Sequence, residues 1–210
     1  MSMVDAIYDH NYFHSNNIED AKKIILGYYG GLNVDERWKL ETEWLIKHIK
    51  FNNEQELVVD YGCGIGRIAK EIKNPVIGVD FSQTMRLQAE VYVSRDGFCA
   101  VNPEIFKVLI DEGLEISGLV SIWAFQHIYE VEEIIDMLMK AMKIGGIFWL
   151  LDLNVRCIHF KFKDSDDVFV YNDEKEILPM IDKWCDLEKV EVVPIYISDV
   201  RLELRKYIRK

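Results

Sequence analysis

The chain has 210 residues, of which 36 are acidic and 25 basic, giving a formal net charge of -11 at pH 7. An excess of negative charge repels polyanions, so the composition argues against a nucleic-acid partner. Half of the residues are apolar, which excludes a polar disordered chain, and the length suits one domain with a substantial core.

Residues 1–5 have neither the basic flank nor the apolar run of a signal peptide, and no apolar run approaches membrane-spanning length. The four cysteines are scattered with no C-x-x-C pair, which is typical of reduced thiols in a cytoplasmic protein. His10 and His14 are spaced for one helix face but lack a third ligand, so we expect no metal site.

Helices are expected over residues 17–29 and 34–50, and Trp38, Leu45 and Ile49 give the second helix an apolar stripe. From residue 57 onward strands and helices alternate, which predicts a parallel sheet covered by helices on both faces. The expected strands are 57–61, 76–80, 97–101, 118–123 and 146–153, and the helices between them are 66–73, 83–94, 104–112 and 131–142.

A polar segment at 155–173 precedes an expected helix at 174–184 and two expected strands at 187–196 and 200–208. The tight connection at Ser198-Asp199 implies an antiparallel pair, because a parallel crossover needs about a dozen residues. We interpret the basic residues near the C-terminus as the solvated face and end of the last strand; they are Arg201, Arg205, Lys206, Arg209 and Lys210.

The most informative stretch is an apolar run that ends in Asp60 and is followed by Gly62, Gly64 and Gly66. It predicts a buried strand that enters a turn almost without side chains, with a helix beginning behind it. Glycine suits a positive φ or the close approach of a ligand, and the N–H groups at a helix start suit an anionic group. We therefore expect a nucleotide-like cofactor. The dinucleotide pattern G-x-G-x-x-G is not met, because Arg67 stands where its third glycine would be.

The observed pattern, D-x-G-x-G-x-G, resembles the first motif of class I S-adenosylmethionine-dependent methyltransferases. The next strand ends in Asp80, while 118–128 and 142–151 resemble the family's fourth strand and its turn into strand 5, with Ile144 where proline is usual. The resemblance covers residues 55–153 well and the remainder by architecture only. It implies a three-layer Rossmann-like α/β fold with a seven-stranded, mostly parallel sheet whose last strand is antiparallel.

In this family the acid that ends strand 2 holds both ribose hydroxyls, and a carboxylate can accept two hydrogen bonds at once. The alternative for Asp80 is a helix cap. Asp60 is expected to contact the ligand or to organise the loop, and its alternative is a turn residue at the end of the strand. At the end of strand 3, where the family often has an acid for the adenine amino group, this chain has Asn102. The resemblance implies that S-adenosylmethionine contacts Asp60, Tyr61, Gly62, Cys63, Gly64, Gly66, Arg67, Asp80, Phe81, Ser82, Met85, Asn102, Trp123 and Ala124.

His127 is the only histidine in a predicted site loop and is a candidate base for a substrate hydroxyl or amine, with a structural histidine as the alternative. Its neighbour Gln126 is a substrate-side candidate. Trp123 could flank adenine or substrate, or belong to the core. Asn154 and Arg156 leave strand 5 toward the same crevice and could hold a substrate carboxylate or phosphate, or lie in a solvated loop.

Residues 1–54 are expected to form an N-terminal helical lid that belongs to the same domain as the core at 55–210, because N-terminal helices often cover the site in this superfamily. Tyr29, Arg37 and Trp38 are the substrate-side candidates of this segment. Ordinary helix packing is the alternative for each of them.

The resemblance implies an enzyme that transfers a methyl group from S-adenosylmethionine to an oxygen or nitrogen of a small molecule, with S-adenosylhomocysteine as product. Amino-methylating DNA enzymes carry N/D-P-P-Y/F where this chain has residues 123–126, and no proline precedes a cysteine as in cytosine-C5 enzymes. The alternatives are a non-catalytic S-adenosylmethionine-binding protein and a nicotinamide-dependent oxidoreductase. The sequence carries no signal for an oligomeric state.

Overall fold

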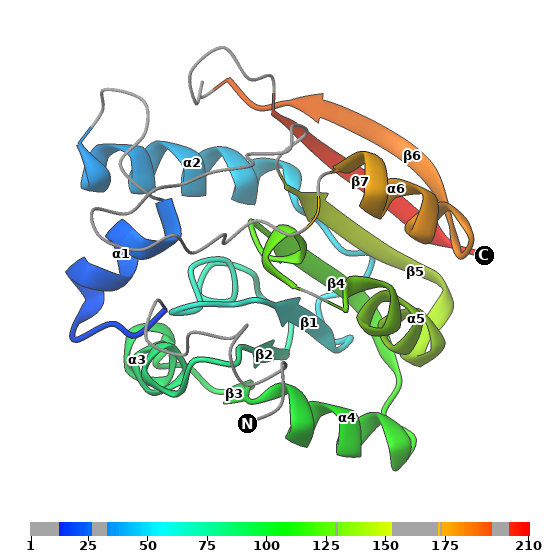
Figure 1. Cartoon of the computed structure of the whole chain (residues 1–210), viewed down its shortest axis with the longest axis horizontal. Helices are drawn as coiled ribbons and strands as arrows, with labels where there is room; N and C mark the ends of the chain where they lie inside the picture. Colours follow the sequence, from blue (N-terminus) through cyan, green and yellow to red (C-terminus); the bar gives the residue numbers. More distant parts are fainter. Residues whose placement is uncertain (1–12, 27–32, 129, 153–171, 173, 195–201) are drawn as a thin grey trace.

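A computed structural model describes residues 13–26, 33–128, 130–152, 172, 174–194 and 202–210. Its centre is a 7-stranded sheet with the strand order β3-β2-β1-β4-β5-β7-β6 (Figure 1). The strands are β1 (Val58–Tyr61), β2 (Val76–Val79), β3 (Phe98–Val101), β4 (Ile116–Ile122), β5 (Met142–Leu151), β6 (Cys185–Val192) and β7 (Glu203–Arg209).

Strands β1 to β5 pair in parallel, whereas β7 runs antiparallel to both of its neighbours, β5 and β6. The predicted fold class, a mostly parallel seven-stranded sheet with an antiparallel last strand, is therefore confirmed. The predicted tight connection at residues 198–199 lies outside the described residues.

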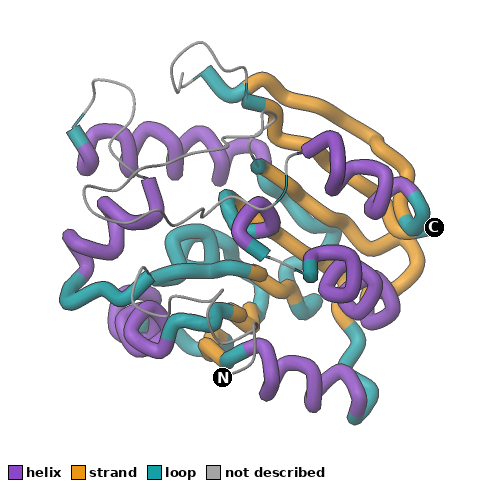
Figure 2. The backbone as a smooth tube through the Cα atoms, in the orientation of Figure 1, coloured by secondary structure: helices purple, strands orange, loops and turns teal. Residues whose placement is uncertain are grey.

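Helices cover both faces of this sheet, as Figure 2 shows in purple against the orange strands. One core packs α4, α5 and α6 against the sheet through Phe106, Ile135 and Ile181. The core on the other face joins α2 and α3 to the strands through Leu45 and Val93. The helices are α1 (Ile18–Leu26), α2 (Val34–His48), α3 (Gln83–Val93), α4 (Pro103–Asp111), α5 (Val131–Ala141) and α6 (Glu174–Asp182), with a short 3-10 helix at Phe125–His127.

The predicted helix at 66–73 is wrong, because the chain forms a succession of turns there. The N–H of Gly66 donates to the carbonyl of Cys63, three residues back, and the N–H of Lys70 donates to Gly66, four residues back. This mixture of hydrogen-bond spacings follows a glycine with φ of +77° and never settles into a regular helix. The other expected elements are present with shifted ends, and the start of β5 at Met142 and the end of β6 at Val192 lie farthest from the expected positions.

The basic residues of β7 and Lys210, which follows it, are engaged with neighbouring groups. Arg205, Lys206 and Lys210 each pair with an acidic side chain at 2.6, 2.5 and 3.3 Å. The guanidinium of Arg209 donates to backbone carbonyls and lies over the ring of Trp184. This part of the basic cluster is thus tied to the protein's own acids and carbonyls.

None of the helices within the described ranges has the length and apolar content needed to cross a membrane.

Phe148 in β5 tests the core that supports the site, because its ring lies between Phe125 and Tyr207, with 5.9 Å between ring centroids on each side. Replacing Phe148 by Ala leaves a cavity, and we expect the free energy of unfolding to fall by about 3–5 kcal/mol. Urea denaturation measures this loss. Ile144→Ala on the same strand is the control: its side chain is 83% exposed, so its effect should stay within about 0.5 kcal/mol. Equal losses in both variants would contradict the described packing.

Candidate functional site

A cavity of about 310 Å³ lies beyond the carboxyl ends of β1, β2 and β4. This is where ligands bind in open α/β sheets. Most of its lining is apolar, and part of it comes from the N-terminal segment. The lining residues are Phe13, Ile24, Ile25, Tyr61, Gly62, Gly64, Val79, Asp80, Phe81, Met85, Pro103, Glu104, Ile122, Trp123, Ala124, His127, Ile128, Glu130 and Ile134.

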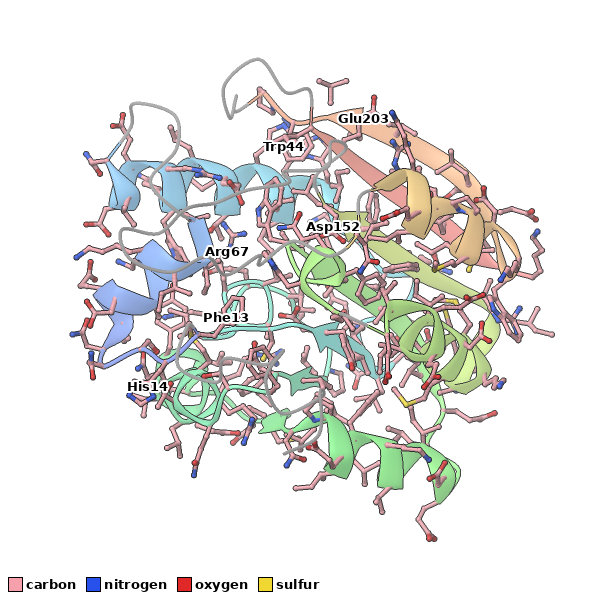
Figure 3. All side chains as sticks on the ribbon, viewed as in Figure 1. Phe13, His14, Trp44, Arg67, Asp152 and Glu203 are labelled. Carbon is pink, nitrogen blue, oxygen red and sulfur yellow. The ribbon has the colours of Figure 1, made fainter. Side chains whose placement is uncertain are left out.

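The structure brings many of the predicted site residues together around this cavity. The predicted residues that line it are Tyr61, Gly62, Gly64, Asp80, Phe81, Met85, Trp123, Ala124 and His127. Figure 3 labels Phe13 and Arg67, which lie near the turn that follows β1 in that view. The shared location of the predicted residues that line the cavity supports a role in binding, which stays a prediction for each of them.

The turn after β1 requires glycine both for its backbone and for space. Gly62 and Gly66 each have φ of +77°, which favours glycine. A Cβ atom on Gly62 would lie 2.2 Å from the Cβ of Ala124, and one on Gly66 would lie 2.4 Å from a methyl of Val93. The turn is therefore packed directly against the loop after β4 and against α3.

Asp80 joins this turn to the end of β2. Its Oδ2 accepts a hydrogen bond from the N–H of Gly64 at 2.8 Å, and its Oδ1 accepts one from the N–H of Ser82 at 2.9 Å. Burial raises the carboxyl pKa above its ordinary value, although these two hydrogen bonds and Arg86 oppose the rise. Each carboxylate oxygen can accept one more hydrogen bond, so Asp80 retains the capacity to bind a diol.

Asp60 lies behind the cavity and does not line it. Its side chain is buried, with 3% exposed, and accepts a hydrogen bond from the backbone of Ala69 across the turn. Burial raises the pKa of Asp60 to about 7, against the opposing effects of this hydrogen bond and of Arg67. Of the roles considered from the sequence, the geometry supports organisation of the loop.

Several other predicted cofactor residues serve local structure. Ser82 caps α3 by accepting from the N–H of Met85, so Asp80 is not the cap of that helix. Asn102 caps α4, and its Oδ1 accepts from the N–H of Ile105 at 2.8 Å. The cap uses one lone pair of the amide oxygen, so the amide nitrogen and the second lone pair of that oxygen are left to face adenine.

Cys63, Gly66 and Arg67 also lie away from the cavity lining. The thiol of Cys63 is buried beside Gly78, where an added Cβ atom would lie 2.8 Å from its sulfur. The guanidinium of Arg67 pairs with Glu41 at 2.9 Å. These residues support the turn from behind.

His127 lines the cavity and packs its ring edge-on against Phe13, with centroids 5.6 Å apart. Its Nε2 lies 3.0 Å from the side-chain nitrogen of Gln126. As this amide is oriented, Gln126 donates, so a neutral His127 carries its proton on Nδ1. Gln126 itself is buried and is not among the described residues that line the cavity.

The substrate-side predictions for α2 do not match the structure. Arg37 and Trp38 are buried, with 3% and 7% exposed, and neither lines the cavity. Arg37 donates to the carbonyl of Leu26 and to Glu41, so its face of α2 turns toward the core. Ordinary packing, the alternative considered for both residues, fits better. Tyr29, Asn154 and Arg156 lie outside the described residues.

Sequence reasoning missed the apolar residues that close the cavity from the N-terminal side, Phe13, Ile24 and Ile25. It also missed Glu104 and Glu130 at the starts of α4 and α5. Nothing local to the sequence says which part of the chain the residues of α1 meet.

The carboxylates among the described residues that line the cavity are Asp80, Glu104 and Glu130. Within this described lining there is no lysine or arginine. Carboxylates at the rim of an apolar cavity favour a ligand that carries positive charge. Among the described residues, no group of three or more His, Cys, Asp or Glu side chains is arranged to hold a metal ion.

Comparison with known proteins agrees with this geometry. Residues 59–150 match the model of a family described as a methyltransferase domain. This segment of the chain is therefore similar to a methyltransferase domain. The sequence matches no curated protein.

Solved structures share the fold of the methyltransferase domain and of the segments around it. A protein from Pyrococcus horikoshii is 18% identical, with a TM-score of 0.65, over 90% of this chain and 98% of that chain. An S-adenosylmethionine-dependent methyltransferase from Mesorhizobium loti is 16% identical, with a TM-score of 0.64, over 82% and 100% of the two chains.

A chain from a complex that contains the Haloferax volcanii Trm112 methyltransferase activator is 14% identical, with a TM-score of 0.64, over 83% of this chain and 91% of that chain. At such low identity each likeness speaks for the fold alone. The family match favours a methyltransferase over the nicotinamide-dependent alternative.

Gly62 offers a direct test of the turn. In Gly62→Ala, a left-handed alanine would meet the Cβ of Ala124, and we expect the free energy of unfolding to fall by roughly 2–5 kcal/mol. The matched control is Gly145→Ala, where φ is +78° and no atom lies within 4 Å of the added Cβ, so about 1–2 kcal/mol should be lost. Denaturant unfolding of both variants measures the difference, and equal losses would show that Gly62 lacks the tight packing described.

Asp60 makes stability depend on pH. Its pKa of about 7 in the folded protein exceeds the ordinary value of 3.8, so the folded state keeps a proton that the unfolded state releases. This stabilisation is fully present below about pH 4 and is lost as the pH rises through about 7, in total on the order of 4 kcal/mol. As the pH rises from 4 to 8, the free energy of unfolding should therefore fall less in Asp60→Asn than in wild type.

Urea unfolding at a series of pH values measures this difference between Asp60→Asn and wild type. Asp96→Asn, at an exposed position, controls for the removal of a carboxyl group. Parallel pH profiles for Asp60→Asn and wild type would exclude Asp60 as the source of the dependence.

Proposed function

We propose that the protein is an S-adenosylmethionine-dependent methyltransferase that methylates an oxygen or nitrogen of a small molecule. The observation that carries the proposal is the meeting of the glycine turn, Asp80 and an apolar cavity at one edge of a methyltransferase sheet. The acidic lining suits this cofactor, which carries a sulfonium charge.

The residues around the cavity would each contribute a different interaction to the binding of the cofactor. Asp80 would accept hydrogen bonds from the ribose hydroxyls, and Phe81 and Trp123 would flank the adenosine with apolar surface. When bound, S-adenosylmethionine would supply an electrophilic methyl group, its sulfur would keep the electron pair of the carbon–sulfur bond, and S-adenosylhomocysteine would be the product. The acceptor nitrogen or oxygen forms the new bond and releases a proton.

The protein's own contribution to such a displacement is proximity, alignment and exclusion of water, which together can supply roughly 7–11 kcal/mol. Phe13, Ile24 and Ile25 close the cavity from the N-terminal side, which supports the proposed lid role of residues 1–54. His127 lines the same cavity and is the proposed base for the acceptor proton.

The acidic lining also supports an uncharged or amine-bearing small molecule as the methyl acceptor. A cytoplasmic location completes the proposal, supported by the three described cysteines, Cys63, Cys99 and Cys185, which are free thiols. The remaining alternative is a protein that binds S-adenosylmethionine without transferring its methyl group. Such a protein would have the same cavity and would differ only in showing no turnover.

Calorimetric titration with S-adenosylmethionine, S-adenosylhomocysteine and NAD tests the cofactor. We expect micromolar binding of the first two and none of NAD. Asp80→Ala should weaken both affinities by at least roughly ten- to hundredfold, because hydrogen bonds to a charged group are lost. Asp96→Ala is the control at an exposed position. Binding of NAD alone would overturn the proposal, and unchanged affinity in Asp80→Ala would overturn the diol assignment.

Turnover separates the enzyme from the non-catalytic alternative. With the cofactor bound, S-adenosylhomocysteine should accumulate when small amines, phenols and alcohols are screened as acceptors. Binding without product across such a screen would favour the alternative.

A further inference from the structure

Glu41 is a carboxylate in the middle of α2 with only 1% of its surface exposed. Three donors from three parts of the chain surround it. Its Oε1 accepts from Arg67 at 2.9 Å and from the indole Nε1 of Trp123 at 2.8 Å, and its Oε2 faces Arg37 at 3.4 Å. Glu41 therefore connects α2 to the turn after β1 and to the loop after β4.

The carboxylate is charged in this position. Burial alone would raise its pKa, but the guanidinium groups of Arg67 and Arg37 and the indole N–H outweigh that effect, and the pKa of Glu41 lies below its ordinary value. A neutral side chain in place of this buried carboxylate would leave the charge of the guanidinium groups uncompensated. The site therefore requires an ionised carboxylate at position 41.

Trp123 is the partner that reaches the cavity. Its φ of +62° places a bulky residue in the left-handed region, a conformation that persists only where the surroundings impose it. The backbone N–H of Trp123 donates to the carbonyl of Leu151 at 2.7 Å, and the far end of its side chain is held by Glu41. Between these two anchors, Trp123 forms part of the cavity wall.

Arg67 brings the second connection. It follows the last glycine of the turn, has 4% of its side chain exposed, and lies over the ring of Trp38 with its guanidinium carbon 5.0 Å from the ring centroid. Its pairing with Glu41 fixes the chain directly behind Gly66. The same carboxylate thus restrains two separate stretches that border the cofactor cavity.

We propose that Glu41 is a positioning residue, which sets the cofactor site by holding the indole of Trp123 at the cavity wall and Arg67 behind the glycine turn. Through it the packing of α2 controls affinity for the cofactor. The part of this inference that concerns affinity rests on the proposed function; the part that concerns the placement of Trp123 does not.

Glu41→Gln tests the proposal, because it keeps the shape of the side chain but places an amide N–H against donors. Glu43→Gln is the matched control on the same helix: its carboxylate is 62% exposed and 3.9 Å from Lys39. The first readout is the indole N–H resonance of Trp123 in a ¹⁵N-correlated NMR spectrum, assigned by its disappearance in Trp123→Phe. We expect a shift in Glu41→Gln and none in Glu43→Gln.

The second readout is the affinity for S-adenosylhomocysteine, measured at a temperature where thermal unfolding shows each variant to be folded. Loss of a charged hydrogen bond predicts roughly ten- to hundredfold weaker binding in Glu41→Gln and no change in Glu43→Gln. Because Glu41 acts in part through Trp123, the loss of affinity in the double variant Glu41→Gln/Trp123→Phe should be smaller than the sum of the two single losses.

An unshifted indole resonance, or wild-type affinity in a folded Glu41→Gln, would overturn the proposal and leave Glu41 with a structural role only. Strictly additive losses in the double variant would do the same. If Glu41→Gln fails to fold, Glu41→Asp replaces it, since it keeps the charge and withdraws the carboxylate by one methylene; the same resonance shift and loss of affinity are expected. Wild-type protein that binds no S-adenosylhomocysteine would refute the proposed function, while the indole resonance would still decide the placement of Trp123.

Discussion

The parallel pairing of β1 with β2 on one side and β4 on the other is the constraint on which the site depends. Asp60 lies opposite Gly78 in β2 and opposite Val120 in β4, so the three strands end at one edge. The turn after β1 then meets the residues after β2 and β4 directly. The hydrogen bond from Gly64 to Asp80 is one result, and the contact of Gly62 with Ala124 is another.

Around this edge the protein keeps three carboxylates in different electrostatic states. Glu41 lies between two guanidinium groups, and its pKa is lowered. Asp60 has one backbone hydrogen bond and a more distant arginine to oppose burial, and its pKa rises to about 7. The half-buried Asp80 lines the cavity itself. Burial disfavours the charged form of all three carboxylates and so raises the pKa of each. The number of donors within hydrogen-bonding distance determines how far that effect is offset.

Because these carboxylates differ in their surroundings, the back and the front of the turn after β1 have different roles. Glu41 and Arg67 form a rigid ionic support behind it, whereas the front presents backbone and carboxylate groups to an apolar cavity. The N-terminal helices contribute to both sides, since α2 supplies Glu41 and α1 supplies Ile24 and Ile25 to the lining. An N-terminal segment that is only a cover would not need a buried charge network with the sheet.

The sequence by itself determined the alternation of strands and helices, the antiparallel last strand and the place of the glycine turn, because periodicity and the need for positive φ are properties of neighbouring residues. It did not determine the turns at 66–73, the capping roles of Ser82 and Asn102, or the burial of Arg37 and Trp38. Only the tertiary structure decided which α1 residues line the cavity and joined Glu41 to Trp123. Those partners are 82 positions apart, and their contact depends on how α2 packs on the sheet, which no local pattern specifies.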